Sequence, residues 1–306
     1  MSNISQIDTN FKIETKLSKQ NIKFFDAKQA PIKLYGIFYE NRKFRRMPEA
    51  VAKTVSDGVY YLHSNSAGGR IRFKTNSPYI AIHAMMSDIG KMSHFTLCGS
   101  GGFDLYEKQR YINTFVPPYD MTDGYESIIE LGLSKMRELT LNFPRYSNVK
   151  ELYIGISDNS IIRDPSPYKH EKPIVYYGSS ITQGGCASRP GSTYQSILSR
   201  ELDTDYINLG FSGNARAEKQ ISEYIQGLDM SVFVYDYDHN APTLEHLEAT
   251  HEAFFKIIRE ANPTLPIVMM SKPDFDSDPR ESTKHREIIK KTIITRLQAV
   301  IKTYIL

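Results

Sequence analysis

The chain has 306 residues, of which 40% are hydrophobic, and this composition is sufficient for two globular domains with buried cores. Lys and Arg total 38 against 35 for Asp and Glu, and the resulting net charge of +3 is too small to attract nucleic acid without a clustered basic patch. The two cysteines, Cys98 and Cys186, lie far apart and lack metal-ligand spacing. We therefore expect reduced thiols, no metal site and no cofactor.

The N-terminal 25 residues lack the apolar segment of a secretory signal, and no stretch of the sequence has the length and hydropathy needed to cross a bilayer. The sequence therefore predicts a cytoplasmic protein without a membrane partner. It gives no indication of the oligomeric state.

From about Ala27 to Ser157, apolar residues alternate with a period near two in short runs separated by glycine, asparagine and proline. This rhythm predicts an N-terminal domain, residues 1–165, built as an antiparallel β-sandwich or jelly roll. The clearest predicted strands span 70–75, 79–85, 126–131, 138–143 and 150–157. Residues 158–173 contain three prolines and are predicted to form a connector.

After the connector, short apolar runs alternate with segments of helical period. Strands are predicted at 174–177, 206–209, 232–235 and 266–270, and helices near 194–202, 217–228, 243–261 and 281–300. Such alternation predicts an α/β fold over residues 173–306, in which helices cover a parallel sheet and ligands bind at the carboxyl ends of the strands.

Polar loops follow the first three predicted strands of this half, at 178–180, 210–214 and 236–240. A serine at a strand-to-helix turn, such as Ser180, exposes its hydroxyl beside the amides of the coming helix, which suits a nucleophile. The spacing G-x-S-x-x-x-G from Gly178 to Gly184 excludes the G-x-S-x-G nucleophile elbow of α/β-hydrolases. Taken alone, a serine flanked by glycines fits an ordinary turn equally well.

Together, the three loops resemble the conserved blocks of the SGNH hydrolases, the GDSL-like lipase and acylhydrolase superfamily. The first block, "GSSIT", resembles G-D-S-[LI] with Ser179 in place of aspartate, so Ser180 corresponds to the nucleophile. "NLGFSG" fits the N-x-x-x-x-G pattern, whose last position, Gly213, corresponds to the oxyanion-hole glycine. Asn240 in "DHNAP" corresponds to the asparagine of the third block, although the usual preceding glycine and following aspartate are missing.

This resemblance implies a flavodoxin-like α/β/α fold and a serine esterase that works through an acyl-enzyme intermediate. Its combination with an N-terminal sandwich is similar to carbohydrate esterases, which implies removal of a small acyl group, such as acetyl, from a carbohydrate or another small hydroxylated substrate. The amides of Ser180 and Gly213 and the side chain of Asn240 would stabilise the oxyanion. Two alternatives stay open: an acyltransferase that uses the same site, and a catalytically impaired protein whose sandwich binds a glycan.

The resemblance also implies a catalytic histidine in a D-x-x-H block near the C-terminus, and no such block follows Met270. We hypothesise that residues 301–306 result from a frameshift and that the hydrolase domain is truncated. Asp236 and His239 spell D-x-x-H but precede Asn240, so they are interpreted as polar wall residues.

For most of the other polar residues near the motifs, we expect a structural role. Ser179 is predicted to be a turn residue, and Arg189 either contacts substrate or lies at the surface. Three histidines fall on predicted helices, where satisfied or solvated side chains are usual: His246, His251 and His285.

Overall fold

The computed structural model describes residues 17, 19–87, 89–273 and 275–304, with only the backbone described at 275 and 295–304. Most of the N-terminal segment considered for a signal peptide lies outside these residues, as do the last two of the six C-terminal residues assigned to a frameshift. No helix among the described residues is both long and apolar enough to cross a membrane.

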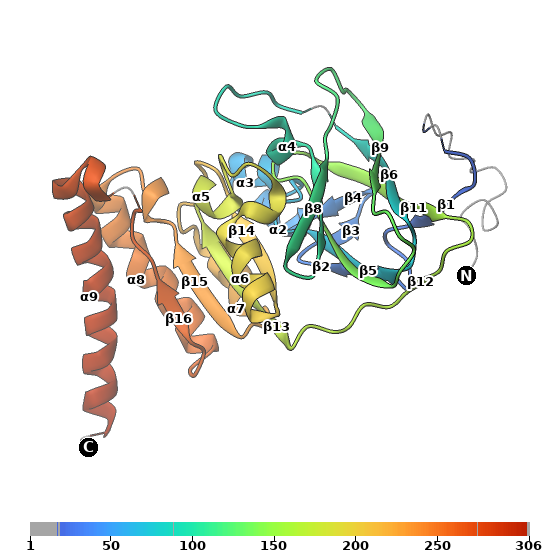
Figure 1. The fold of residues 1–306 in the computed structure, drawn as a ribbon. Helices are drawn as coiled ribbons and strands as arrows, with labels where there is room; N and C mark the ends of the chain where they lie inside the picture. Colours follow the sequence, from blue (N-terminus) through green and yellow to red (C-terminus); the bar gives the residue numbers. More distant parts are fainter. Residues whose placement is uncertain (1–16, 18, 88, 274, 305–306) are drawn as a thin grey trace. The chain divides into compact units, whose positions relative to one another are not determined.

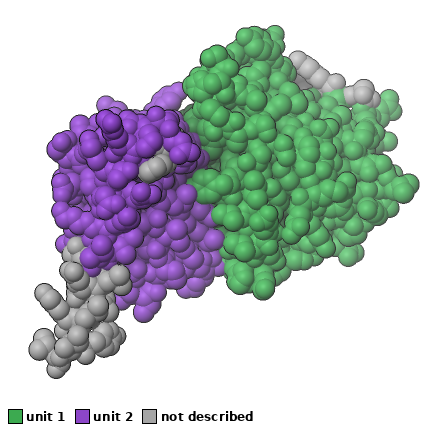
Figure 2. Space-filling model, turned by 60° about the vertical axis from the view of Figure 1, so that its left-hand side comes forward, with its two compact units in different colours: residues 1–48, 63–171, 184–208 green, residues 49–62, 172–183, 209–306 purple. Residues whose placement is uncertain are grey.

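The chain divides into two compact units, each assembled from segments that are distant in the sequence (Figure 2). Unit 1 comprises Met1–Pro48, His63–Glu171 and Gly184–Asn208, and unit 2 comprises Glu49–Leu62, Lys172–Gln183 and Leu209–Leu306. The division into domains 1–165 and 173–306 stays a prediction about the organisation of the chain.

Unit 1 contains two large antiparallel sheets, which confirms the predicted β-sandwich (Figure 1). One sheet has the order β1-β11-β6-β9, and the other has the order β12-β5-β10-β7-β8 with β2 also paired to β5. The strands are β1 (Ile22–Asp26), β2 (Lys33–Tyr35), β5 (Arg70–Thr75), β6 (Tyr79–Met86), β7 (Phe103–Glu107), β8 (Arg110–Phe115), β9 (Gly124–Glu130), β10 (Arg137–Asn142), β11 (Val149–Ser157) and β12 (Ile162–Arg163). Their inward-facing side chains, such as Phe73, Leu139 and Ile154, form one apolar core.

The outer face of the second sheet is polar, because alternate residues of a strand point to opposite sides. Arg70 and Arg72 on β5 alternate with the core residues Ile71 and Phe73. Segment 184–208 of the same unit, which includes helix α6 (Tyr194–Leu202), binds to this face, and Arg70 Nη1 donates to the carbonyl of Tyr206 at 3.1 Å. Polar side chains of the sheet are therefore buried.

Two helices that the sequence analysis did not predict lie at residues 49–62, between the strands of the N-terminal half. Helices α2 (Glu49–Val55) and α3 (Asp57–Leu62) belong to unit 2 and bury Ala52, Val59 and Leu62. A hairpin of β3 (Phe38–Glu40) and β4 (Lys43–Arg45) precedes them, and a short helix α4 (Leu97–Ser100) follows. The predicted connector also contains structure, because β12 pairs with β5 and β13 begins at His170.

The C-terminal half contains the predicted parallel sheet, with the strand order β14-β13-β15-β16. Its strands and helices are β13 (His170–Gly178), α5 (Ser180–Gln183), β14 (Thr204–Gly210), α7 (Lys219–Gln226), β15 (Val232–Asp236), α8 (Leu244–Ala261), β16 (Ile267–Met269) and α9 (Pro279–Tyr304). Helix α7 packs on α8, and α8 packs on α9. In chain order the sheet is 2-1-3-4, the flavodoxin-like arrangement, in which the ligand crevice lies between the ends of the first and third strands.

Candidate active site

The first predicted loop leaves β13 at Gly178 and enters α5 at Ser180. A Cβ atom at Gly178 would lie 2.2 Å from the carbonyl oxygen of Asp236, so glycine permits the ends of β13 and β15 to approach closely. Ser179 is buried and its Oγ accepts the amide of Ile181 at 3.2 Å, which is the predicted turn role. Ser180 is half-buried, in contrast to the buried Ser179.

The second predicted loop is bonded directly to the first. The amide of Phe211 donates to the carbonyl of Gly178 at 2.8 Å, and the amide of Ser212 donates to Oε1 of the buried Gln183 at 2.9 Å. Gly213 has φ +69, and no atom lies within 4 Å of the position that a Cβ atom would take there, so it forms an open, left-handed corner of the loop.

The third predicted loop contacts both of the others. Asp236, at the end of β15, accepts a hydrogen bond from Thr182 Oγ1 at 3.0 Å. Asn240 ends the 3-10 helix η2 (Asp238–Asn240) and donates from Nδ2 to the carbonyl of Phe211 at 3.0 Å. The structure thus brings together the three loops that carry Ser180, Gly213 and Asn240, while the catalytic roles of these residues stay predictions.

Asp238 is a buried carboxyl directly beside these residues. It is 1% exposed, and its burial raises its pKa to about 7 despite the amide of Lys272, which donates to Oδ2 at 3.1 Å. His285 Nδ1 lies 3.5 Å from the same oxygen, which links α9 to the third loop. The third loop therefore contains a carboxyl group that titrates near neutral pH.

The general base implied by the family resemblance has no counterpart bonded to Ser180 in the described part of the chain. Among these residues, no side chain forms a hydrogen bond with the Ser180 hydroxyl. His251 is buried, its pKa is lowered to about 4 by burial, and its Nδ1 lies 2.9 Å from Thr292 Oγ1. His246 contacts the carbonyl of Arg216 at 2.9 Å, so both histidines have structural partners.

The sequence interpretation missed Asp104, which is fully buried on the polar face of β7. Its Oδ1 accepts from Asn142 Nδ2 at 2.8 Å and its Oδ2 accepts from the amide of Gly191 at 2.7 Å. Burial raises the pKa of Asp104 to about 6. The signal was the single carboxylate in the apolar run "GFDLY", residues 102–106.

Arg189 is held within unit 1 by the same cluster. Its Nε lies 3.7 Å from Asp104 Oδ2, and its guanidinium lies 4.1 Å from the ring centroid of Tyr111. Through these contacts Arg189 packs against β7 and β8. Separately, the described residues contain no group of three or more His, Cys, Asp or Glu side chains that could hold a metal ion.

Two protein-family models together match nearly the whole chain. The model described as the GDSL-like lipase/acylhydrolase family matches residues 171–304. The model described as GxDLY, the N-terminus of SGNH-hydrolase-type esterases, matches residues 22–162. The "GFDLY" run that contains Asp104 has the G-x-D-L-Y pattern of this second description. No curated protein matches the chain.

Solved structures share the fold over most of the chain. A protein described as a GDSL-like lipase from Bacteroides ovatus is 29% identical with a TM-score of 0.81, and the match covers 92% of this chain and 85% of that one. A salicylyl-acyltransferase from a tetracycline biosynthetic pathway is 18% identical with a TM-score of 0.71, and the match covers 89% of this chain and 80% of that one. An acetyl xylan esterase from Butyrivibrio proteoclasticus is 13% identical with a TM-score of 0.53, and the match covers 89% of this chain and 86% of that one.

Proposed function

Because the chain belongs to the GDSL-like lipase/acylhydrolase superfamily of SGNH hydrolases, we propose that it is a serine esterase that removes a small acyl group through an acyl-enzyme intermediate. Ser180 Oγ forms a bond to the ester carbonyl carbon, and its proton passes to a base. The alcohol then leaves with a proton, and water releases the acid from acyl-Ser180.

The amides of Ser180 and Gly213 and the side-chain amide of Asn240 stabilise the negative charge on the carbonyl oxygen. Asn240 Nδ2 carries two protons, and its bond to the carbonyl of Phe211 uses one of them. The second proton serves as the oxyanion donor. Such donors act strongly because the fold holds them in place before the charge develops.

The single observation that carries the proposal is the bonding among the three strand-end loops. Gln183, Thr182 and Asn240 each hydrogen-bond to a neighbouring loop, at 2.9, 3.0 and 3.0 Å. A nucleophile, a glycine amide and an asparagine amide consequently share one edge of the parallel sheet, between the first and third strands.

The proposed substrate is an acetyl ester of a carbohydrate or of another small hydroxylated molecule. The acetyl xylan esterase with the same fold supports this substrate class, as does the combination of a sandwich with a hydrolase unit.

The test is hydrolysis of p-nitrophenyl acetate by the purified chain and by Ser180→Ala, with labelling by a fluorophosphonate probe. We expect turnover and labelling by the parent chain and neither by the variant, because both reactions need the Ser180 hydroxyl. Ser179→Ala is the matched control, since it removes the neighbouring hydroxyl. Equal turnover in the parent and Ser180→Ala would overturn the proposal.

The salicylyl-acyltransferase of the same fold favours acyl transfer as a second candidate function. The acyl-Ser180 intermediate would then react with an acceptor alcohol or amine in place of water. Adding acceptors to the ester assay separates the two functions, because a transferase forms a new ester or amide faster than free acid. No turnover together with glycan binding would instead support the impaired binding protein.

A further inference from the structure

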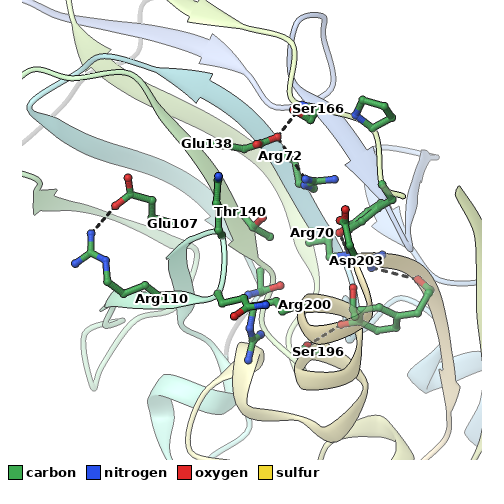
Figure 3. Close-up of a pocket in the computed structure, with 17 residues that line it drawn as sticks. Arg70, Arg72, Glu107, Arg110, Glu138, Thr140, Ser166, Ser196, Arg200 and Asp203 are labelled. Atoms are coloured by element: carbon green, nitrogen blue, oxygen red, sulfur yellow. Dashed lines mark hydrogen bonds and ion pairs between the residues drawn. The ribbon is translucent and has the colours of Figure 1, made fainter. Parts of the chain in front are cut away.

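Unit 1 contains a cavity of about 620 Å³ on the outer face of its second sheet. Its walls come from β5, β7, β10, the loop before β13 and helix α6, and every lining residue belongs to unit 1 (Figure 3). The lining contains none of Ser180, Gly213 and Asn240. The volume falls within the range of small-molecule sites.

The cavity is basic. Its lining includes five cationic residues, Arg70, Arg72, Lys108, Arg110 and Arg200, against three carboxylates, Glu107, Glu138 and Asp203, so the difference is 5 − 3 = +2. Arg70 is bound to Asp205, and Arg110 is bound to Glu107 at 2.5 Å. Arg72, Lys108 and Arg200 are the lining cations that these two ion pairs do not involve.

Arg72, like Arg70, is a buried cation of this cavity, and its hydrogen bonding is incomplete. The residue is 7% exposed, and its buried Nη1 has no hydrogen-bond partner among the described residues. Its Nη2 lies 3.4 Å from Glu138 Oε1, an oxygen that already accepts the amide of Ser166 at 2.7 Å. A buried N–H without a partner is costly, so a ligand oxygen that bonds to this guanidinium would bind favourably.

Arg72 is also held in a fixed orientation. Its guanidinium lies 4.1 Å from the ring centroid of Tyr168, and Figure 3 shows it beside Glu138 among the lining side chains. Stacking on an aromatic ring reduces the freedom that the side chain would lose on binding a ligand.

Arg200 supplies a second cation from helix α6. Its guanidinium lies 4.1 Å from the ring centroid of Tyr106, and no carboxylate of the described residues forms an ion pair with it. Thr140 also lines the cavity, and its hydroxyl forms no hydrogen bond to a described residue. Two cations and one hydroxyl can therefore bind a ligand without breaking a strong internal bond.

We propose that this cavity is a binding site for a small hydroxylated carboxylate, such as a sugar acid, held by Arg72 and Arg200. The planar guanidinium of Arg72 matches a carboxylate in two-point geometry. Three carboxylates in the lining disfavour a dianion such as phosphate more than a monoanion. The hydroxyl and amide groups of Thr140 and Gln109 suit the hydroxyls of such a ligand.

The test is calorimetric titration of the full chain with D-glucuronate, D-glucose and inorganic phosphate. We expect glucuronate to bind at least about tenfold more tightly than glucose, because the carboxylate adds charge-assisted hydrogen bonds. Phosphate should bind more weakly than glucuronate. Absence of glucuronate binding, equal binding of glucose, or tighter binding of phosphate would each overturn the proposal.

Variants locate the site. Arg72→Gln should weaken glucuronate binding about tenfold or more, since it removes a charged donor. Arg200→Gln provides a second test on a less buried arginine in case Arg72→Gln fails to fold, which thermal unfolding would reveal. Arg163→Gln, on the exposed side of β12, is the matched control and should bind normally.

Ser180→Ala should also bind glucuronate normally, because Ser180 does not line this cavity. This result separates the cavity from the proposed esterase: loss of esterase activity with retained binding supports both assignments. Loss of glucuronate binding in Ser180→Ala, or unchanged binding in both arginine variants, would contradict the proposed site.

Discussion

At the scale of single residues, Asn240 has two tasks that can be separated by experiment. Its side-chain amide holds the second loop through the carbonyl of Phe211, and in the proposed mechanism it also donates to the oxyanion. The first task contributes about 1 kcal/mol to stability, as ordinary hydrogen bonds do. The hydrogen bond to the oxyanion stabilises only the transition state and does not contribute to the stability of the fold.

Asn240→Ala should therefore lower kcat for ester cleavage by about 100-fold or more, the usual cost of one oxyanion donor, while lowering stability only slightly. The measurements are steady-state kinetics and thermal unfolding. Asn214→Ala is the matched control, because Asn214 Nδ2 also donates to a loop carbonyl, that of Ser212, at 2.7 Å. A comparable loss of kcat in both variants would assign Asn240 to loop structure alone.

Asp104 allows a prediction of how the free energy of unfolding depends on pH. Burial raises its pKa to about 6, whereas an unfolded aspartate titrates near about 3.9. The folded state therefore binds more protons than the unfolded state between these values. The contribution of Asp104 to the free energy of unfolding is then largest below about pH 4 and falls as the pH rises to about 6.

Asp104→Asn removes this titration without a large change of shape. We expect the difference in unfolding free energy, parent minus variant, to fall by on the order of 2 kcal/mol between about pH 4 and pH 7. Urea denaturation at several pH values measures it. A difference that stays constant or rises with pH would show that the carboxyl group is not titrating as described.

At the scale of elements, the fit between the second loop and α5 depends on a glycine. A Cβ atom at Gly210 would lie 2.1 Å from the backbone nitrogen of Gln183, so Gly210→Ala must displace backbone atoms. We expect it to lower the free energy of unfolding by about 3 kcal/mol or more. Gly213→Ala is the matched control for stability, because only its φ of +69 opposes a side chain, at about 1 kcal/mol. If urea denaturation showed that both variants lose the same free energy of unfolding, the close packing of Gly210 against Gln183 would not be important for stability.

The elements also show what the sequence alone can predict. Strong local periodicity predicted the helix 243–261 and the strand 232–235 within a residue of α8 and β15, and the turns after the strands predicted where the three loops lie. Helices α2 and α3 were missed because they are short and belong to unit 2, although in the sequence they lie between segments of unit 1. Local propensity carries no information about such a distant partner.

The buried polar face of the second sheet could not be predicted for a related reason. A strand such as β5, with alternating Arg and apolar residues, predicts one face in the core and one in water. Segment 184–208 instead covers the polar face, and Asp104 on β7 lies 87 residues from its partner Gly191. Contacts at that separation have no local signature apart from the unusual carboxylate itself.

At the scale of the whole molecule, the interleaving of the two units predicts how the chain responds to being divided. A cut after residue 165, at the predicted domain junction, removes segment 184–208 from unit 1 and segment 49–62 from unit 2. In unit 1, the buried guanidinium of Arg145 would lose the carbonyls of Gly184 and Ala187. In unit 2, Asn214 would lose its packing against Gly58.

Neither fragment 1–165 nor fragment 166–306 should therefore unfold cooperatively when it is produced alone, because each would expose polar groups and apolar surface that the intact unit buries. Co-expression of the two fragments should restore a cooperative thermal transition, since all segments of both units are then present. Circular dichroism melts and analytical gel filtration provide the measurement. The matched control is the full chain cleaved at a protease site inserted after residue 165, which keeps every segment in place and should retain its transition. If fragment 1–165 alone melted as cooperatively as the cleaved full chain, segment 184–208 would be dispensable to the sandwich, and the domain boundary would lie where the sequence places it.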